Sequence, residues 1–188
     1  MSSVHNYFDS YFDFRCTRPM TKAIRDEYKG NDLVGVEIGV LYGNHALNML
    51  RNLNIKKLYL IDAYEEYSDY VLPMRKGNKV SDIERIAKHK LSDYNDRIVW
   101  IKDYSTNAID SIKDDLDFVY IDGNHEYEYV LDDIKLYYPH IKSGGFIGGH
   151  DADNINVIRA VIDFFMSKGI EPTRRNVTIL LHDWWAYK

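Results

Sequence analysis

Histidine and aspartate side chains lie in two short segments whose residue types suit acid–base or metal chemistry. The first segment, D-G-N-H, holds Asp122 and His125, and the second, H-D-A-D, holds His150, Asp151 and Asp153. Two carboxylates brought close together repel each other unless a proton or a cation lies between them. Carboxylate oxygens suit Mg²⁺ or Ca²⁺, and a histidine near its ordinary pKa suits proton transfer at neutral pH. A loop histidine that makes one structural hydrogen bond is the plainer alternative for each imidazole.

A second group of residues has the pattern of a nucleotide site. The segment V-E-I-G-V-L-Y-G-N-H places Gly39 and Gly43 where a strand is expected to turn into a helix, with Glu37 just before the turn. Glycine permits such a turn, and the helix amides that follow it can face a ligand. Asp62 lies about 20 residues past the turn, where an acid binds ribose hydroxyls in related sheets. A tight turn without a ligand is the alternative.

The elements that must position these residues alternate between short apolar runs and amphipathic helices. The runs are apolar almost throughout, which is typical of strands covered on both faces, and the helices place apolar residues three and four positions apart. This alternation predicts an α/β fold with a mostly parallel sheet. The expected strands are 33–38, 57–61, 98–101, 117–121 and 145–149, and the expected helices are 44–53, 80–94, 127–141 and 155–167.

Both ends of the chain depart from the alternation. The last residues predict two antiparallel strands at one sheet edge, joined by a tight turn near Arg175–Asn176. Trp184 and Trp185 are expected to cap that edge or to lie in an oligomer interface. Residues 1–30 are expected to form one or two helices outside the sheet, and residues 64–79 a long loop over the strand ends. Asp132 and Asp133 are expected on a solvated helix face.

Composition limits the class of protein. The chain has 188 residues, a mass of 22.1 kDa and a net charge of −5, which fits one domain and gives no reason to expect a nucleic-acid partner. No apolar run approaches the length of a membrane span, and the start of the chain lacks the pattern of a signal peptide. Cys16 is the only cysteine, expected to be buried, and its isolation favours a reducing, cytoplasmic setting.

The glycine segment resembles the first motif of the class I S-adenosylmethionine-dependent methyltransferases, in the letters E-I-G-V-L-Y-G. The resemblance implies that Gly39 and Gly43 line the methionine part of the cofactor and that Asp62 holds the ribose. It also implies that Asp103, Tyr104 and Ser105, after the third strand, flank the adenine. Glu37 would act near the cofactor's amino group or shape the turn.

The segments D-G-N-H-E-Y and K-S-G-G-F-I-G-G-H-D resemble the methyltransferase domain 24 group, kin of macrolide-sugar and catechol O-methyltransferases. The resemblance runs from about Val34 to Asp151. In the catechol-type relatives two acids and an amide hold a divalent metal, which implies Asp122 and Asp151 as ligands. Ala152 stands where the relatives carry the third ligand; Asp153 or Asn154 would have to replace it, so sites with and without a metal both stay open. His125 occupies the place of the base that takes the acceptor's proton.

These observations predict a Rossmann-like three-layer sandwich with a seven-stranded sheet, in one methyltransferase domain over 1–188 that has a helical segment (1–30) and a core (31–188). The expected reaction is O-methylation of a small hydroxylated acceptor, a sugar or a phenol, with His125, Asp122 and His150 as catalytic candidates. A non-catalytic cofactor-binding module is one alternative. A nicotinamide-dependent oxidoreductase is another, although the G-x-G-x-x-G fingerprint is absent. The aromatic residues at both ends of the chain favour a homodimer.

Overall fold

The computed structural model describes residues 17–65, 80–173 and 176–188. Its helices are α2 (Pro19–Tyr28), α3 (Asn44–Asn52), α4 (Val80–Lys90), α5 (Ser105–Ala108), α6 (Tyr127–Tyr137) and α7 (Ile155–Ser167), with single 3-10 turns at Ser92–Tyr94, Ile109–Ser111 and Tyr138–His140. Its strands are β1 (Leu33–Ile38), β2 (Ile55–Ile61), β3 (Ile98–Ile101), β4 (Leu116–Ile121), β5 (Ile141–Gly149), β6 (Val177–Leu180) and β7 (Asp183–Tyr187). None of the helices in these ranges is long and apolar enough to cross a membrane.

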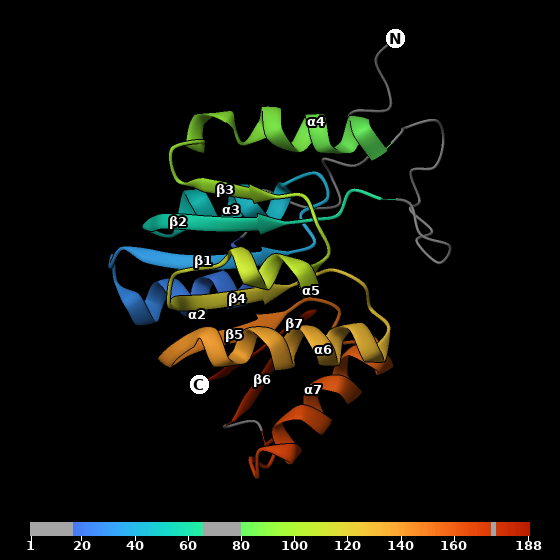
Figure 1. The fold of residues 1–188 in the computed structure, drawn as a ribbon. Helices are drawn as coiled ribbons and strands as arrows, with labels where there is room; N and C mark the ends of the chain where they lie inside the picture. The colour runs from blue at the N-terminus through green and yellow to red at the C-terminus, as the bar shows by residue number, and fades with distance from the viewer. Residues whose placement is uncertain (1–16, 66–79, 174–175) are drawn as a thin grey trace.

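The seven strands form one sheet in the order β3-β2-β1-β4-β5-β7-β6. The first five strands in this order run parallel, and β7 pairs antiparallel with both β5 and β6. The chain starts the sheet in the middle, builds outward through β2 and β3, and then returns to place β4 on the other side of β1 (Figure 1). The order therefore reverses between β1 and β4, which is where sheets of this kind bind ligands.

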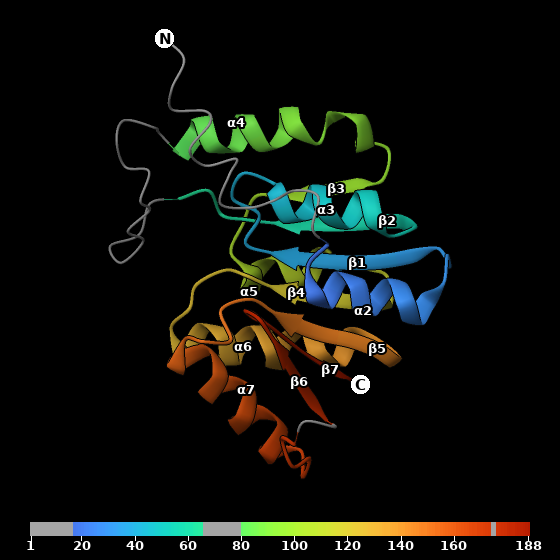
Figure 2. The same cartoon turned by 180° about the vertical axis from the view of Figure 1, so that it is seen from behind.

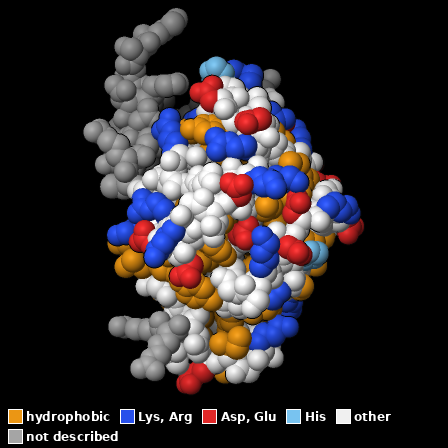
Figure 3. All heavy atoms as spheres, turned by 90° about the vertical axis from the view of Figure 1, so that its left-hand side faces the viewer, with side chains coloured by type: hydrophobic (Ala, Val, Ile, Leu, Met, Phe, Trp, Pro, Cys, Tyr) orange, Lys and Arg blue, Asp and Glu red, His pale blue; other side chains and the backbone are white. Residues whose placement is uncertain are grey.

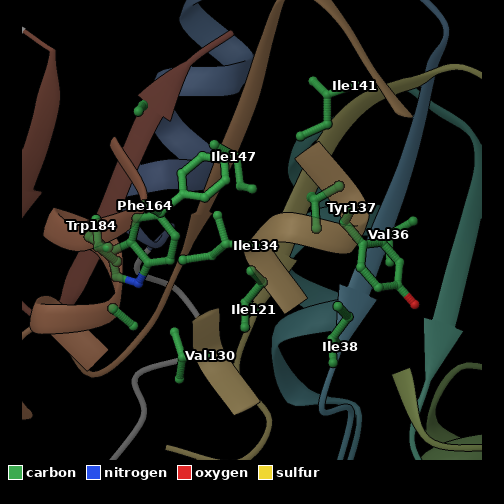
Figure 4. Close-up of a cluster of buried hydrophobic side chains, with 14 of the residues drawn as sticks. Val36, Ile38, Ile121, Val130, Ile134, Tyr137, Ile141, Ile147, Phe164 and Trp184 are labelled. Carbon is green, nitrogen blue, oxygen red and sulfur yellow. The ribbon is translucent and has the colours of Figure 1, made fainter. Parts of the chain in front are cut away.

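Helices cover both faces of the sheet, which confirms the predicted three-layer sandwich. Figures 1 and 2 show α2 and α3 on one face and α5, α6 and α7 on the other, while α4 lies beyond β3. One buried cluster joins Val36, Ile38 and Ile121 of the strands to Val130 and Ile134 of α6 (Figure 4). A second cluster packs α2 and α3 on the opposite face. Because successive strand residues point to opposite faces, neighbours in β1 contribute to different layers.

The C-terminal hairpin is present, but its turn is misplaced in the sequence-based prediction. The turn lies at Leu181 and His182, between β6 and β7, and not near Arg175–Asn176. The tryptophans of β7 are also not edge caps: Trp184 is fully buried in the core beneath α6 and α7, and Trp185 is buried on the α2 face. β7 is thus an interior strand, and β6 alone forms that edge of the sheet.

Other expectations hold in part or lie outside the described residues. α2 confirms one helix in the N-terminal segment, whereas Cys16 and most of the expected loop over 64–79 are not among the described residues. The expected helices 80–94 and 127–141 end earlier, at Lys90 and Tyr137, and each is followed by a 3-10 turn.

On the face at the amino ends of the strands, basic and acidic side chains are interspersed (Figure 3).

Candidate active site

The carboxyl ends of the parallel strands bring the predicted site residues to one edge of the sheet, at the right of Figure 1. Gly39 follows β1, Asp62 follows β2, Asp122 follows β4, and His150 and Asp151 follow β5. This edge includes the point where the strand order reverses. The fold therefore gathers residues that lie more than a hundred positions apart in the chain.

The turn after β1 requires its glycines. Gly39 has a φ of +86°, and a Cβ there would overlap the carbonyl of Asp122. Gly43 has a φ of +71° and forms the N-cap of α3, where a Cβ would press against Leu91. Side chains are therefore excluded where the β1 turn passes the end of β4.

Asp62 holds this turn in place through its carboxylate. One oxygen, Oδ2, accepts hydrogen bonds from the backbone N–H groups of Val40 and Leu41, both at 2.9 Å, and Oδ1 accepts from the N–H of Tyr64 at 2.8 Å. Leu41 and Tyr64 both have positive φ values, 50° and 48°. Non-glycine residues in this region carry strain that the surroundings must offset, and Asp62 supplies part of that support.

The side chain of Asp103 ties together the residues between β3 and α5. The Oδ1 of Asp103 accepts hydrogen bonds from the Tyr104 backbone N–H at 2.7 Å and from the Asn107 side chain at 2.9 Å. The exposed Tyr104 hydroxyl donates to Glu65 Oε2 at 2.8 Å, which links this loop to the one that follows β2. Glu65 has no motif signal in the sequence, and only the fold brings it to this edge.

Two side chains of α6 hold Ser105 in place through hydrogen bonds. The Tyr137 hydroxyl donates to the Ser105 carbonyl at 2.7 Å, and the Ser105 side chain bonds to the carboxyl of Asp133. Asp133 is buried, so its expected place on a solvated helix face is wrong, whereas its neighbour Asp132 is exposed. Burial raises the pKa of Asp133 to about 7, against a lowering by Ser105. The start of α5 therefore rests on a buried acid.

Glu37 belongs to a buried polar chain below the glycine turn. Its Oε1 lies 3.1 Å from Nδ1 of His45, and Nε2 of His45 lies 3.2 Å from the Thr21 hydroxyl. Burial and the nearby charge of Asp122 raise the pKa of Glu37, and burial and Arg18 lower that of His45. Both shifts favour the neutral forms of these two side chains. Glu37 Oε2 has no hydrogen-bond partner within the described part of the chain.

Two acids and two histidines meet at the ends of β4 and β5. His125 Nε2 lies 2.9 Å from Asp151 Oδ2, and His150 Nδ1 lies 3.0 Å from the same oxygen. Both imidazoles are also 3.8 Å from Asp122 Oδ1. Asp151 has a positive φ of 55°, an unusual conformation for a residue other than glycine. The fold thus brings together all three predicted catalytic residues and two of the three predicted metal ligands.

The charges of this cluster fix its protonation. The carboxylates of Asp122 and Asp151 raise the pKa of His125 to about 10, against a lowering by burial. Burial raises the pKa of Asp151, but the hydrogen bonds from His125 and His150 outweigh it and leave that pKa well below its ordinary value. At neutral pH His125 is therefore an imidazolium paired with the Asp151 carboxylate.

The same donors fit a divalent cation. Asp122, His125 and Asp151 each offer a ligand atom, and the three atoms lie within 4.8 Å of one another. Nitrogen and carboxylate oxygen donors at this spacing suit a first-row or hard divalent ion. Asp153 lies apart from this group: its exposed carboxylate is 3.2 Å from Nδ1 of His182. Among the described residues, Asp153 is therefore not part of this group of donors.

A family model settles the classification of the chain. The model of a methyltransferase domain, methyltransferase domain 24, matches residues 36–152, which is more than half of the chain. The chain belongs to the methyltransferase domain 24 family. The match includes the glycine turn and Asp62, and it extends through His125 to Asp151. The predicted resemblance to S-adenosylmethionine-dependent methyltransferases is confirmed.

Known proteins similar to this family member include one curated relative and many solved structures. Uncharacterized protein R132 of Acanthamoeba polyphaga mimivirus is 27% identical over 129 residues, covering 66% of this chain and 53% of that protein, so the chain spans about half the relative's length. The O-methyltransferase NovP is 16% identical with a TM-score of 0.65 over 90% of this chain and 79% of NovP. MycE methyltransferase, solved with Mg and SAH, is 16% identical with a TM-score of 0.55 over 90% of this chain and 49% of MycE. These structures share the fold.

Proposed function

We propose that this protein transfers a methyl group from S-adenosylmethionine to a hydroxyl group of a small acceptor, of the sugar or phenol type. One observation carries the proposal: His125 lies between the carboxylates of Asp122 and Asp151, beside the glycine turn of a methyltransferase-family domain. Methyl transfer from a sulfonium needs an aligned acceptor and a place for the acceptor's proton. A base and two carboxylates next to the cofactor turn supply both.

The cofactor is assigned to the residues around the β1 turn. Gly39 and Gly43 leave room along the methionine part, and Asp62 lies where the ribose hydroxyls are expected. Asp103, Tyr104 and Ser105 are assigned to the adenine side. Glu37 lies below the turn with one oxygen that lacks a described partner, which supports a role in binding the cofactor's amino group or in shaping the turn.

The proton balance of the reaction assigns His125 its role. The acceptor oxygen forms a bond to the methyl carbon as the sulfonium carbon–sulfur bond breaks, and the electron pair of that bond goes to sulfur. The hydroxyl proton passes to Nε2 of His125, which must first be neutral. With a pKa of about 10, His125 keeps its own proton at neutral pH as long as both carboxylates face it. His150 is the second candidate for the same task.

A divalent cation would change this balance. Held by Asp122 and Asp151, it would lower the pKa of the acceptor hydroxyl. The same carboxylates would then stabilise the His125 imidazolium less, and the pKa of His125 would fall toward neutrality. Because Asp153 is exposed and paired with His182, we assign the remaining ligand positions to water or to the acceptor.

Titration calorimetry with S-adenosylhomocysteine, with and without Mg²⁺, tests the cofactor site. We expect binding that weakens sharply in Asp62→Ala, and an effect of Mg²⁺ that disappears in Asp151→Asn. Methyl transfer to a pool of sugars and phenols then tests the chemistry. We expect His125→Asn to lower turnover by roughly 10²-fold or more, while binding of S-adenosylhomocysteine stays unchanged. The exposed His89 of α4 gives the control variant His89→Asn.

Each result distinguishes the proposal from an alternative. Tight binding of S-adenosylhomocysteine without methylation of any hydroxylated compound would identify a non-catalytic cofactor-binding module. Binding of a nicotinamide cofactor in place of S-adenosylhomocysteine would identify an oxidoreductase. Turnover that survives both EDTA and His125→Asn would keep the reaction but reject the assigned mechanism.

A further inference from the structure

A partly buried arginine lies beside the candidate site without belonging to any of its motifs. Arg18 immediately precedes α2, and only 16% of its side chain is exposed. Its Nη1 bonds to the Tyr120 hydroxyl, and lies 3.5 Å from Asp122 Oδ2 and 3.8 Å from Asp183 Oδ1. The guanidinium carbon is 5.8 Å from the centre of the Tyr120 ring. A permanently charged group thus faces one oxygen of the Asp122 carboxylate.

The surroundings of Arg18 fix this charge in place. The Tyr120 hydroxyl donates to Asp183 Oδ1 at 2.9 Å, and Asp183 Oδ2 accepts from the backbone N–H of Met20 at 3.1 Å. Tyr120 and Asp183 are each 1% exposed. The contacts therefore join α2 to β4 and β7 around the guanidinium. Burial lowers the pKa of Arg18, but Tyr120 and the carboxylates of Asp122 and Asp183 outweigh it and raise that pKa, so the charge persists throughout the working pH range.

The two oxygens of Asp122 have different neighbours. Oδ2 faces Arg18, whereas Oδ1 faces the imidazoles of His125 and His150 at 3.8 Å. A carboxylate can rotate about its Cβ–Cγ bond unless a neighbouring group holds one of its oxygens. The guanidinium of Arg18 restricts this rotation by holding Oδ2, and it also adds one positive charge to a site that carries two carboxylates.

We propose that Arg18 is a positioning residue that holds Oδ2 of Asp122, so that Oδ1 is directed toward His125 and a bound cation. The inference rests on the proposed function, since it assigns Asp122 to that site. It has two measurable parts. The guanidinium orients the carboxylate, which supports turnover, and its charge weakens the attraction of the site for cations.

Binding of Mn²⁺, followed by electron paramagnetic resonance without cofactor or acceptor, tests the charge. Removal of a fixed positive charge this close to the ligands is expected to tighten Mn²⁺ binding roughly tenfold in Arg18→Met. Arg18→Lys keeps the charge and should bind Mn²⁺ like the wild type. Partial unfolding would weaken cation binding, so tighter binding would report the removed charge and not a damaged fold. Arg25→Met is the matched control, because Arg25 lies on the same helix and its ion pair with Asp26 is exposed.

Turnover tests the orientation. We expect kcat to fall at least tenfold in Arg18→Met and less in Arg18→Lys, with little change in the affinity for S-adenosylhomocysteine. If Arg18→Met does not fold, Tyr120→Phe removes the hydroxyl that holds the guanidinium and keeps both the ring and the charge of Arg18; kcat should then fall by a smaller factor, while the affinity for Mn²⁺ stays close to that of the wild type.

Two results would overturn the inference. One is wild-type kcat in folded Arg18→Met, which would reject the orienting role, and the other is unchanged or weaker Mn²⁺ binding in that variant, including no binding in either protein, which would reject the effect of the charge. If the proposed function itself is wrong, the result is different: the wild type will bind no S-adenosylhomocysteine, whether or not it binds Mn²⁺.

Discussion

His125 and His150 both contact Asp151, and this shared carboxylate makes the site sensitive to pH. The pKa of His125 is raised from about 6.5 to about 10 by Asp122 and Asp151, against burial. A histidine whose pKa is raised in the folded state stabilises the fold fully below its unfolded pKa, and the stabilisation is lost as the pH rises through the folded pKa. The pH range of interest therefore runs from about 6.5 to about 10.

We expect the difference in unfolding free energy between the wild type and His125→Gln to shrink steadily over that pH range. Because the His125 side chain is 43% exposed, solvent screens the interaction and the whole effect is modest. Urea denaturation at a series of pH values measures it, with His89→Gln as the control. A difference that stays constant from pH 6 to 10 would show that the imidazolium does not pair with these carboxylates.

Site residues differ in how far the sequence predicts them. Asp122, His125 and Asp151 sit in short motifs directly after apolar runs, so the strand pattern alone places them at one edge. Arg18 carries no such signal, because its contact with Asp122 spans more than a hundred positions and depends on how α2 packs. The contact between Glu37 and His45 could not be predicted from the sequence either. The two residues flank the glycines of the β1 turn, but they meet only because α3 packs against β1.

Strand and helix patterns predict most elements because the parallel strands are buried on both faces and read as unbroken apolar runs. The predicted position of the hairpin turn is wrong for a specific reason. Leu181 adopts a positive φ of 56° within a run of apolar residues that contains no Gly, Pro or Asn to mark a turn. Asparagine is a residue type that favours turns, but strand β6 begins directly after Asn176. The C-terminal error therefore lies in turn chemistry and leaves the sheet order intact.

Asp133 on α6 carries a prediction at the scale of packed helices. It lies on the same stripe as the buried Val130, Ile134 and Tyr137, and burial raises its pKa to about 7. An acid whose folded pKa is raised disfavours folding once it ionises, so the fold loses stability as the pH rises from about 4 to 7. Above pH 7 the loss is complete.

We expect Asp133→Asn to stabilise the protein above pH 7 by an amount on the order of 2 kcal/mol and to have little effect below pH 4. The asparagine oxygen can still accept from Ser105, which keeps the start of α5 in place. Chemical denaturation at pH 4 and pH 8 measures the change. Asp132→Asn is a close control, since Asp132 is the adjacent, exposed acid. Equal stability of Asp133→Asn and the wild type at pH 8 would contradict a buried, titrating carboxyl.

At the scale of the whole molecule, the described residues form one layered unit. Trp184 and Trp185 are neighbours in β7, yet they pack into the cores on opposite faces of the sheet. β7 also carries Asp183, which joins α2 and β4 near the candidate site. The last strands therefore complete the sheet that holds the β1 turn.

A ligand that binds only the folded state of such a unit stabilises all of it. S-adenosylhomocysteine at about a hundred times its dissociation constant should add about 2.7 kcal/mol and raise the Tm by roughly 5 °C or more, while NAD should leave the Tm unchanged. Asp62→Asn should abolish the shift and also lower the Tm without ligand, because Asp62 holds three backbone N–H groups. Asp93→Asn, at an exposed acid, should retain the full shift. Equal shifts in both variants would remove Asp62 from the cofactor site, and a shift with NAD alone would replace the methyl donor with a nicotinamide cofactor.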